Sequence, residues 1–391
     1  TGDNNIAVGS DALNATTTAN NNVAVGYNAL TSNTTGEQNV AVGSLALDET
    51  TTASYNTAVG YDTLSANTTG IVHTALGWGA LKTNTTGSEN TACGANSLYY
   101  NTTGSYNTAV GRQSLTNNTT ASYNTGLGYR TLFDNTTGAQ NTALGALALI
   151  TNTTANNNTG LGYKALEATT TGSQNTSVGA HSLDANTTGS ENTACGYDVL
   201  SDNTTGQGNL GVGAYALADN TTGGSNVAAG YLAMYKNTTG TENVAVGALS
   251  LKLLTTSSRN VAVGYRAMED STTAQDTVAV GYAALTNNTT GNYNTAVGSE
   301  ALVNNTTADN NTAVGEHALR ENSTGAKNTA VGTNALYANT TASDNVAVGY
   351  NALTANTTGA RNTAVGREAL DTQTTADDNT TVGYQAGQAI T

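Results

Sequence analysis

Apolar and polar residues alternate along this chain in a pattern that recurs at one fixed interval. Counted from Asn5, the pattern is N-[T/V]-A-[V/L]-G-x-x-A-L-x-x-N-T-T-[G/A]-x-x, and it occurs 22 times without an insertion or deletion before a partial copy over residues 379–391. We number the repeat positions 1 to 17 from its first Asn. Position 5 is Gly in all 23 copies, and position 14 is Thr in all 22 complete ones. A fixed period of this kind is typical of proteins built from stacked structural repeats.

The short apolar segments predict strands rather than helices. Residues 39–42 (Asn-Val-Ala-Val) are rich in β-branched residues and end at a glycine, as expected of a short strand followed by a turn. A 17-residue repeat is too short for a pair of stable helices, and its Thr, Val, Asn and Gly oppose helix formation. An insertion would shift every later residue off its partner in a stacked parallel array, which explains the constant period. We therefore predict an all-β fold, a parallel β-solenoid of about 22 coils that forms a single continuous domain over residues 1–391.

Each repeat position predicts one column of the solenoid. We expect positions 4 and 9 to form the buried core, for example Val178 and Leu183, with Ala at positions 3 and 8 where the walls approach. Gly at positions 5 and 15 should adopt turn conformations that a side chain would prevent. Asn at positions 1 and 12 and Thr at positions 13 and 14 should form hydrogen-bonded ladders. Charged residues concentrate at positions 6, 7, 10, 11, 16 and 17, the predicted outer surface. The second repeat gives one example of each structural column: Asn22, Val25, Gly26, Leu30, Thr34 and Thr35.

A weaker alternation of Tyr and Ala at position 6 leaves two interpretations of the coil. It runs from Tyr129 and Ala146 to Tyr265 and changes phase at Tyr282. One coil could contain two repeats, or it could contain one repeat with bulky and small residues alternating along the stack. The change of phase is harmless only with one repeat per coil, which we favour. The rod would then be about 105 Å long, at about 4.8 Å per coil, rather than half that length.

Composition and charge exclude several classes of protein. The chain has no Pro, one Phe, one Trp and only 10% charged residues, so it lacks the large apolar side chains of a wide globular core. Its regular Val and Leu also argue against disorder. The net charge of −15 disfavours nucleic acids and anionic membranes as partners. No apolar stretch approaches the roughly 20 residues of a membrane span, and no signal peptide is visible at Thr1, which suggests an internal piece or a mature product.

Neither the cysteines nor the histidines predict a site. Cys93 and Cys195 both occupy position 4, six coils apart and beyond the reach of a disulfide, and we expect both to be buried thiols. The histidines, His73, His181 and His317, are too widely spaced to share a metal ion. We therefore assign them structural or surface roles.

Two further patterns imitate catalytic motifs. Gly211 and Gly213 form a G-x-G like that of dinucleotide-binding proteins, but it is the repeat glycine plus one Ala-to-Gly change, with no helix after it. Asp202 and Asp219 share position 11 of successive repeats and could lie about 5 Å apart, as the carboxylates of retaining glycosidases do. No aromatic cleft near them in the sequence would raise a pKa or bind a sugar, so we interpret them as solvated charges. We expect no catalytic, cofactor-binding or metal-binding residue.

The Asn at position 12 begins an N-x-T glycosylation sequon in 16 repeats, for example at Asn33, Asn67, Asn84 and Asn356. Sugars on acceptors about 4.8 Å apart would overlap. We therefore interpret this Asn mainly as a ladder residue, with at most sparse modification.

The strand segments resemble those of a known family. V-A-V-G at residues 23–26, 40–43, 244–247, 261–264 and 346–349 resembles the repeat of the YadA-like heads of trimeric autotransporter adhesins. The Asn-Thr-rich N-T-A-V-G-Y segments are similar to repeats of phage-type tail fibre proteins. The resemblance implies a left-handed parallel β-roll, association of three chains and binding to host surfaces or matrix. The period of this chain is longer than in that family, and no neck, coiled-coil stalk or membrane anchor is visible.

These observations favour a non-enzymatic, extracellular fibre segment at a cell surface or on a virion. A catalytic site needs unlike groups in one place, whereas a repeated surface suits multivalent binding to a host-surface glycan or matrix protein. Possible surface contacts are the position-17 tyrosines Tyr55, Tyr106, Tyr123 and Tyr293. A homo-oligomer, either a trimer or an end-to-end filament, is expected. Two alternatives are a self-stacking mechanical filament and an ice-binding solenoid; the latter would need Thr at positions 12 and 14, and position 12 is mostly Asn.

Overall fold

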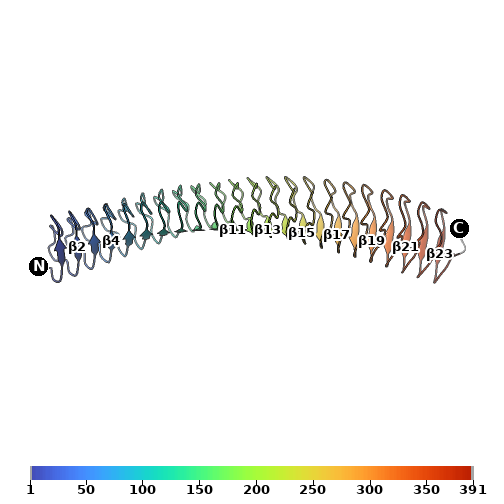
Figure 1. The fold of residues 1–391 in the computed structure, drawn as a ribbon, viewed down its shortest axis with the longest axis horizontal. Coiled ribbons are helices and arrows are strands. Elements are labelled where there is room, and N and C mark those ends of the chain that lie inside the picture. The colour runs from blue at the N-terminus through green and yellow to red at the C-terminus, as the bar shows by residue number, and fades with distance from the viewer. Residues whose placement is uncertain (1, 389–391) are drawn as a thin grey trace. The chain divides into compact units, whose positions relative to one another are not determined.

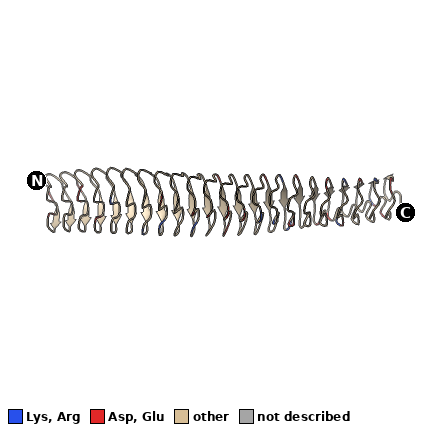
Figure 2. Ribbon diagram, turned by 90° about the horizontal axis from the view of Figure 1, so that it is seen from above, with Lys and Arg blue, Asp and Glu red and all other residues tan. Residues whose placement is uncertain are grey.

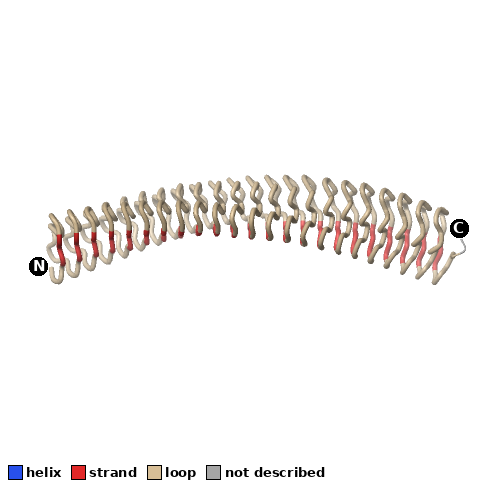
Figure 3. Tube along the Cα trace, viewed as in Figure 1, coloured by secondary structure: helices blue, strands red, loops and turns tan. Residues whose placement is uncertain are grey.

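The computed structural model describes residues 2–388, so the last three residues of the partial repeat 379–391 lie outside the described part. The chain divides into two compact units, Thr1–Asn192 and Thr193–Thr391. Each unit is a stack of coils, and each coil contributes one three-residue strand followed by turns (Figures 1 and 3). Residues 2–388 include no helix, and thus none of the length and hydropathy that a membrane span requires.

The strands recur once per repeat in both units. The first unit contains β1 (Ile6–Val8), β2 (Val23–Val25), β3 (Val40–Val42), β4 (Thr57–Val59), β5 (Thr74–Leu76), β6 (Thr91–Cys93), β7 (Thr108–Val110), β8 (Thr125–Leu127), β9 (Thr142–Leu144), β10 (Thr159–Leu161) and β11 (Thr176–Val178). The second unit contains β12 (Thr193–Cys195), β13 (Leu210–Val212), β14 (Val227–Ala229), β15 (Val244–Val246), β16 (Val261–Val263), β17 (Val278–Val280), β18 (Thr295–Val297), β19 (Thr312–Val314), β20 (Thr329–Val331), β21 (Val346–Val348), β22 (Thr363–Val365) and β23 (Thr380–Val382).

Consecutive strands within each unit pair in parallel with an offset of one repeat. Ala7 of β1 lies opposite Ala24 of β2, and Gly211 of β13 lies opposite Ala228 of β14. This register confirms the all-β parallel β-solenoid. It also decides between the two interpretations of the coil, because each coil contains one repeat.

Fewer repeat positions are buried in the core of each coil than the sequence predicts. Ala24, Ala29 and Leu30, at positions 3, 8 and 9, are fully buried, whereas Val25 at position 4 is only half-buried. Val178, also at position 4, exposes 37% of its surface. The prediction that position 4 belongs to the core is therefore wrong. Successive strand residues point to opposite sides, so a buried Ala at position 3 turns positions 2 and 4 outward.

The buried leucine of position 9 adopts an unusual backbone conformation. Its φ lies between 48° and 56° in all 22 complete repeats, including Met234 and Met268. The left-handed region costs an L-residue about 1–2 kcal/mol, and it is especially unfavourable for β-branched residues. Leu and Met are unbranched at Cβ and still fill the core. This explains why position 9 excludes Val and Ile.

The predicted turn role of glycine holds at position 5 but not at position 15. The position-5 glycines have φ between 109° and 145°, and a Cβ on Gly26 would overlap the carbonyl group of Gly43 in the next coil. Gly36 at position 15 has no positive φ, and Ala53 occupies the same buried position in the following repeat. Space rather than conformation restricts position 15. The other left-handed residues lie at positions 7 and 17.

The six positions predicted as the outer surface are exposed or half-buried in most coils. Exceptions such as Glu269, with 8% of its surface exposed, are few. Charged residues are sparse along the ribbon of each unit (Figure 2). The coil therefore combines a constant interior with a variable exterior.

Candidate functional site

Two columns of buried side chains, mostly asparagine, join the coils of each unit; the column at position 12 is interrupted where another residue replaces Asn, as at Thr169 and Leu254. At position 1, the Oδ1 atom of Asn22 accepts a hydrogen bond from the backbone N–H of Asn39 (2.9 Å), and its Nδ2 donates to the carbonyl oxygen of Gly36 (2.9 Å). At position 12, Asn84 Nδ2 donates to Asn67 Oδ1 in the preceding coil (2.9 Å). These side chains are fully buried. Satisfied amides in a buried network specify one register and make the scaffold stiff.

Burial of position 12 bears on the glycosylation sequons. Asn33, Asn67, Asn84 and Asn356 have no exposed surface. Asn33 Nδ2, the atom that a glycan would occupy, donates to Gly36 O at 3.0 Å. The acceptor nitrogens are thus inaccessible in the folded coil.

The two threonine columns differ in their contacts. At position 13, the hydroxyl of Thr34 donates to the carbonyl oxygen of Thr51 in the next coil (3.0 Å), which confirms that ladder. At position 14, only the backbone N–H of Thr35 takes part, again with Thr51 O (3.3 Å). The position-14 side chain is exposed in all 22 repeats. The side-chain ladder predicted for Thr35 is therefore wrong.

His73 replaces asparagine in the position-1 ladder and reproduces its hydrogen bonds. Its Nδ1 atom accepts from the backbone N–H of Asn90 (3.2 Å), and Nε2 lies 2.8 Å from the carbonyl oxygen of Gly87. Because the backbone N–H must donate, the neutral tautomer with its proton on Nε2 fits both partners. Burial lowers the pKa of His73 to about 4, so the ring is neutral at physiological pH.

The other two histidines lie beside carboxylates at the surface. His181 Nδ1 lies 3.0 Å from Asp184 Oδ2, and His317 Nε2 lies 3.7 Å from Glu300 Oε2. Among residues 2–388, no three His, Cys, Asp or Glu side chains gather in a way that could hold a metal ion.

The cysteines are not buried as predicted. Cys93 is half-buried and Cys195 is exposed, and both are free thiols. The reason is the same as for Val25, because position 4 lies on the outward side of the strand.

The carboxylates of Asp202 and Asp219 lie in unlike environments. Asp219 Oδ2 accepts a hydrogen bond from Lys236 Nζ (2.6 Å) and forms an ion pair with it. Partial burial, with the charge of Asp219 as a smaller contribution, raises the pKa of Asp202. Because Lys236 neutralises its carboxylate, Asp219 belongs to a surface ion pair.

The G-x-G of the second unit has a packing explanation. A Cβ on Gly211 would lie 2.5 Å from Cγ1 of Val199, which fills position 8 where most repeats have Ala. The glycine therefore makes room for a larger neighbour. Gly213 is the usual position-5 glycine, with φ of 109°.

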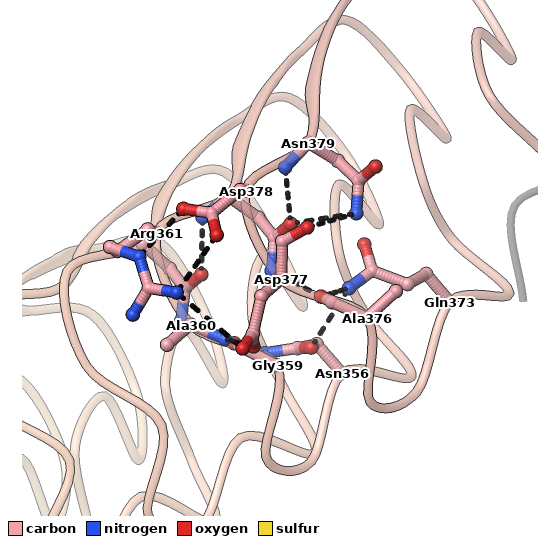
Figure 4. Close-up of polar contacts among 11 residues, drawn as sticks. Asn356, Gly359, Ala360, Arg361, Gln373, Ala376, Asp377, Asp378 and Asn379 are labelled. Atoms are coloured by element: carbon pink, nitrogen blue, oxygen red, sulfur yellow. Dashed lines mark hydrogen bonds and ion pairs between the residues drawn. The ribbon is translucent and has the colours of Figure 1, made fainter.

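The last complete repeats are joined by a charged contact in addition to the ladders (Figure 4). Arg361 binds Asp378 of the next coil through Nε (2.6 Å) and Nη2 (2.8 Å), and its Nη2 lies 3.5 Å from Asp377. The Arg361 guanidinium lowers the pKa of Asp378. Gln373 replaces Asn at position 12, and its Nε2 still lies 3.5 Å from Asn356 Oδ1. The ladder thus tolerates a longer amide here.

The tyrosines singled out from the sequence are exposed, as predicted. Tyr55, Tyr106, Tyr123 and Tyr293 have between 47% and 59% of their surface exposed. Tyr106 and Tyr123 occupy position 17 of consecutive coils and stack with ring centroids 5.0 Å apart and planes 4° apart. Where two adjacent coils both carry Tyr, the spacing of the solenoid thus builds an aromatic stack on the surface.

Sequence reasoning missed one feature of the first unit. The only Trp and the only Phe of the chain, Trp78 and Phe133, line one depression of about 440 Å³ together with Tyr99 and Tyr100. The sequence does contain a signal, because the only Tyr-Tyr pair falls between these two rarest residues, within a few repeats of both. A classification of aromatic residues by repeat position alone conceals that clustering.

Comparison of the sequence with protein-family models and with curated proteins found no match. The resemblance to adhesin heads and tail fibres therefore stays a prediction.

Proposed function

We propose that this chain is a non-enzymatic fibre segment that acts outside the cell, at a cell surface or on a virion, and binds its target through many similar weak contacts. The observation that carries the proposal is the recurrence of exposed aromatic rings on a hydrogen-bonded scaffold. Tyr106 and Tyr123 stack at position 17, and Tyr265 and Tyr282 stack at position 6, with centroids 5.8 Å apart.

Each coil has a recurring hydrogen-bonded interior and a variable exterior, and this difference supports the proposal. The interior amides that recur at positions 1 and 12 pair with the neighbouring coil, as Asn22 and Asn39 do. The exterior positions are free to vary without disturbing those bonds. Linked weak contacts strengthen binding through effective concentration, so a repeated surface favours a long or clustered target such as a glycan or a matrix protein. The same repetition is the reason to propose no catalysis, which needs unlike groups in one place.

The test is the dependence of binding on repeat number. Chains of four, eleven and twenty-two repeats would be passed over immobilised polysaccharide and matrix protein. Sedimentation would determine separately whether the chain forms a trimer. We expect retention that rises much more steeply than in proportion to repeat number. A variant with Tyr55, Tyr106, Tyr123 and Tyr293 all changed to Ser should lose that rise while keeping its thermal stability. Retention independent of repeat number would contradict the proposal.

Ice binding is a second candidate, and one observation favours it. Position 14 presents an exposed Thr in every complete repeat of both units. The predicted companion column at position 12 is buried, for example Asn33, so the surface offers one threonine column rather than two. Thermal hysteresis that increases with repeat number, without retention on the surfaces above, would favour this candidate. If neither response appears, the self-stacking filament becomes the preferred function.

A further inference from the structure

One part of the first unit departs from the repeat in a coordinated way. Position 10 carries Tyr99 and Phe133, position 11 carries Tyr100 and position 6 carries Trp78, and all four line the same depression of about 440 Å³. Trp78 and Tyr100 expose 52% and 50% of their surfaces. Large aromatic rings that remain exposed in a chain with so few of them are typical of a binding surface.

The rings are held in place by their neighbours. Tyr99 and Tyr100 meet edge to face, with centroids 4.7 Å apart and planes at 74°. The Lys82 ammonium lies 5.6 Å from the centre of the Tyr99 ring, and Asp62 holds that lysine at 2.6 Å. A rigid aromatic surface loses little conformational entropy when a ligand binds.

Gly79 provides the space that this arrangement needs. It is the only glycine at position 7 of any repeat. A Cβ at this residue would lie 3.0 Å from Cε2 of Tyr99 and 3.0 Å from Oδ1 of Asn96. The absence of a side chain at Gly79 thus leaves room for the Tyr99 ring beside the amide of Asn96.

The depression also contains a polar atom without a partner. Asn96 Oδ1 is buried and accepts no hydrogen bond within the described chain. The hydroxyl of Thr116, another lining residue, is already used, since it donates to the Asn96 backbone oxygen at 3.0 Å. A buried acceptor without a donor costs about 1–3 kcal/mol. Because that oxygen is itself buried, the hydroxyl groups of a ligand would pair instead with the half-buried amides of Gln113 and Asn117, which line the same depression.

A second depression of about 450 Å³ adjoins the first, because Tyr100 and Asn117 line both. Its remaining lining is threonine, and the hydroxyls of Thr102 and Thr119 each donate to a carbonyl of the next coil at 3.0 Å. Tyr100 therefore lies between the two depressions, of which the first is more polar than the second. Two adjoining depressions suit a ligand with at least two linked rings.

From this geometry we infer that the two depressions around Tyr100 form a binding site for a neutral oligosaccharide. Pyranose rings present an apolar C–H face that packs on aromatic rings and an edge of hydroxyl groups that pair with amides, and the site combines both kinds of group. No residue that lines either depression carries a formal charge. The lining itself thus supplies no counter-charge to an anionic saccharide, which would also meet a chain of net charge −15. This inference rests on the adhesive role proposed above and names its ligand class at one place.

The single tryptophan makes the site directly testable in the full chain. Its fluorescence would be titrated with soluble cellohexaose, maltohexaose, laminarihexaose, mannohexaose and chitohexaose, and with hexagalacturonate as the anionic counterpart. We expect at least one neutral hexasaccharide to change the emission of Trp78 saturably at millimolar concentration or below. Tyr100→Ala should weaken that binding at least tenfold without changing the melting temperature. Leu144→Ala removes an equally exposed apolar side chain outside the depressions (47% exposed) and should leave the affinity unchanged.

Three outcomes would overturn the inference: no emission change with any neutral hexasaccharide at 10 mM, equal affinity in Tyr100→Ala, or a response to hexagalacturonate alone. These failures are distinct from failure of the adhesive role, because a soluble hexasaccharide reports one site whereas surface retention reports repeat number. If retention rises with repeat number but no saccharide changes the emission of Trp78, the saccharide site is refuted and the proposed adhesive role is not.

Discussion

His73 introduces a titratable group into the buried ladder of position 1, and this makes the stability of its coil depend on pH. Asn90 N–H donates to Nδ1 of the neutral ring, and Gly87 O accepts from Nε2. Protonation would place a second N–H opposite that of Asn90 and bury a positive charge without a counter-ion. The ordinary pKa of 6.5 is accordingly lowered to about 4 by burial.

The direction of the change in stability with pH follows from which state of the chain, unfolded or folded, takes up the proton on His73 at the higher pH. The unfolded chain takes up a proton near pH 6.5, whereas the folded chain does so only near pH 4. The contribution of His73 is therefore constant above about pH 7, falls as the pH decreases from 6.5 to 4, and is constant again below that. At about 1.4 kcal/mol per pH unit, the loss is about 2 kcal/mol at pH 5 and about 3 kcal/mol at pH 4 and below.

His73→Asn supplies a matched control, since it restores the residue that the ladder uses elsewhere. Each coil of a solenoid contacts mainly its neighbours, so the effect should be local. Hydrogen exchange of β4, β5 and β6 would be compared between the two proteins at the same pH. We expect equal protection at pH 7.5 and about 30-fold lower protection of the wild type at pH 5. Equal protection at pH 4, or an equal loss in β9 and β10, would refute the reasoning.

Three other changes test the assignment of the columns. Leu183→Asp should destabilise the first unit by several kcal/mol because it buries an unpaired charge, whereas Val178→Asp should cost about 1 kcal/mol or less because that side chain points outward; equal melting temperatures of the two variants would contradict the assignment. Leu30→Ile should cost more than Leu30→Met, since only the β-branched residue is incompatible with a φ of 52°; denaturant unfolding compares them, and equal midpoints would argue against strain. Burial raises the pKa of Asp48 to about 6, so the folded state favours its protonated form and stability falls as the pH rises from about 4 to 6. Asp48→Asn should therefore raise the melting temperature at pH 8 but not at pH 3.5, and an equal effect at both pH values would rule out this titration.

The fold could be predicted almost entirely from the sequence because the repeat has a constant length. Once the Val, Thr and Gly content has favoured strands over helices, a constant period without insertion places each residue of a parallel stack opposite its own counterpart, as Ala7 lies opposite Ala24. The buried Leu30, the turn at Gly26 and the amide ladder through Asn22 followed from the same argument. So did the exposure of the position-17 tyrosines, because columns that vary in charge and size cannot lie in a shared core.

The tertiary structure decided which side of each short strand faces inward. A three-residue strand offers either its middle residue or its two outer ones to the core, and hydrophobicity alone favoured Val25 over Ala24. The closely approaching walls of a one-repeat coil admit only the smaller side chain, which turned Val25 and the cysteines outward. The sequence by itself therefore determined the period, the strand and the ladders. Only the packed coil could bring Trp78 and Phe133 into one depression, because that proximity depends on how positions 6 and 10 of different coils turn toward each other in space.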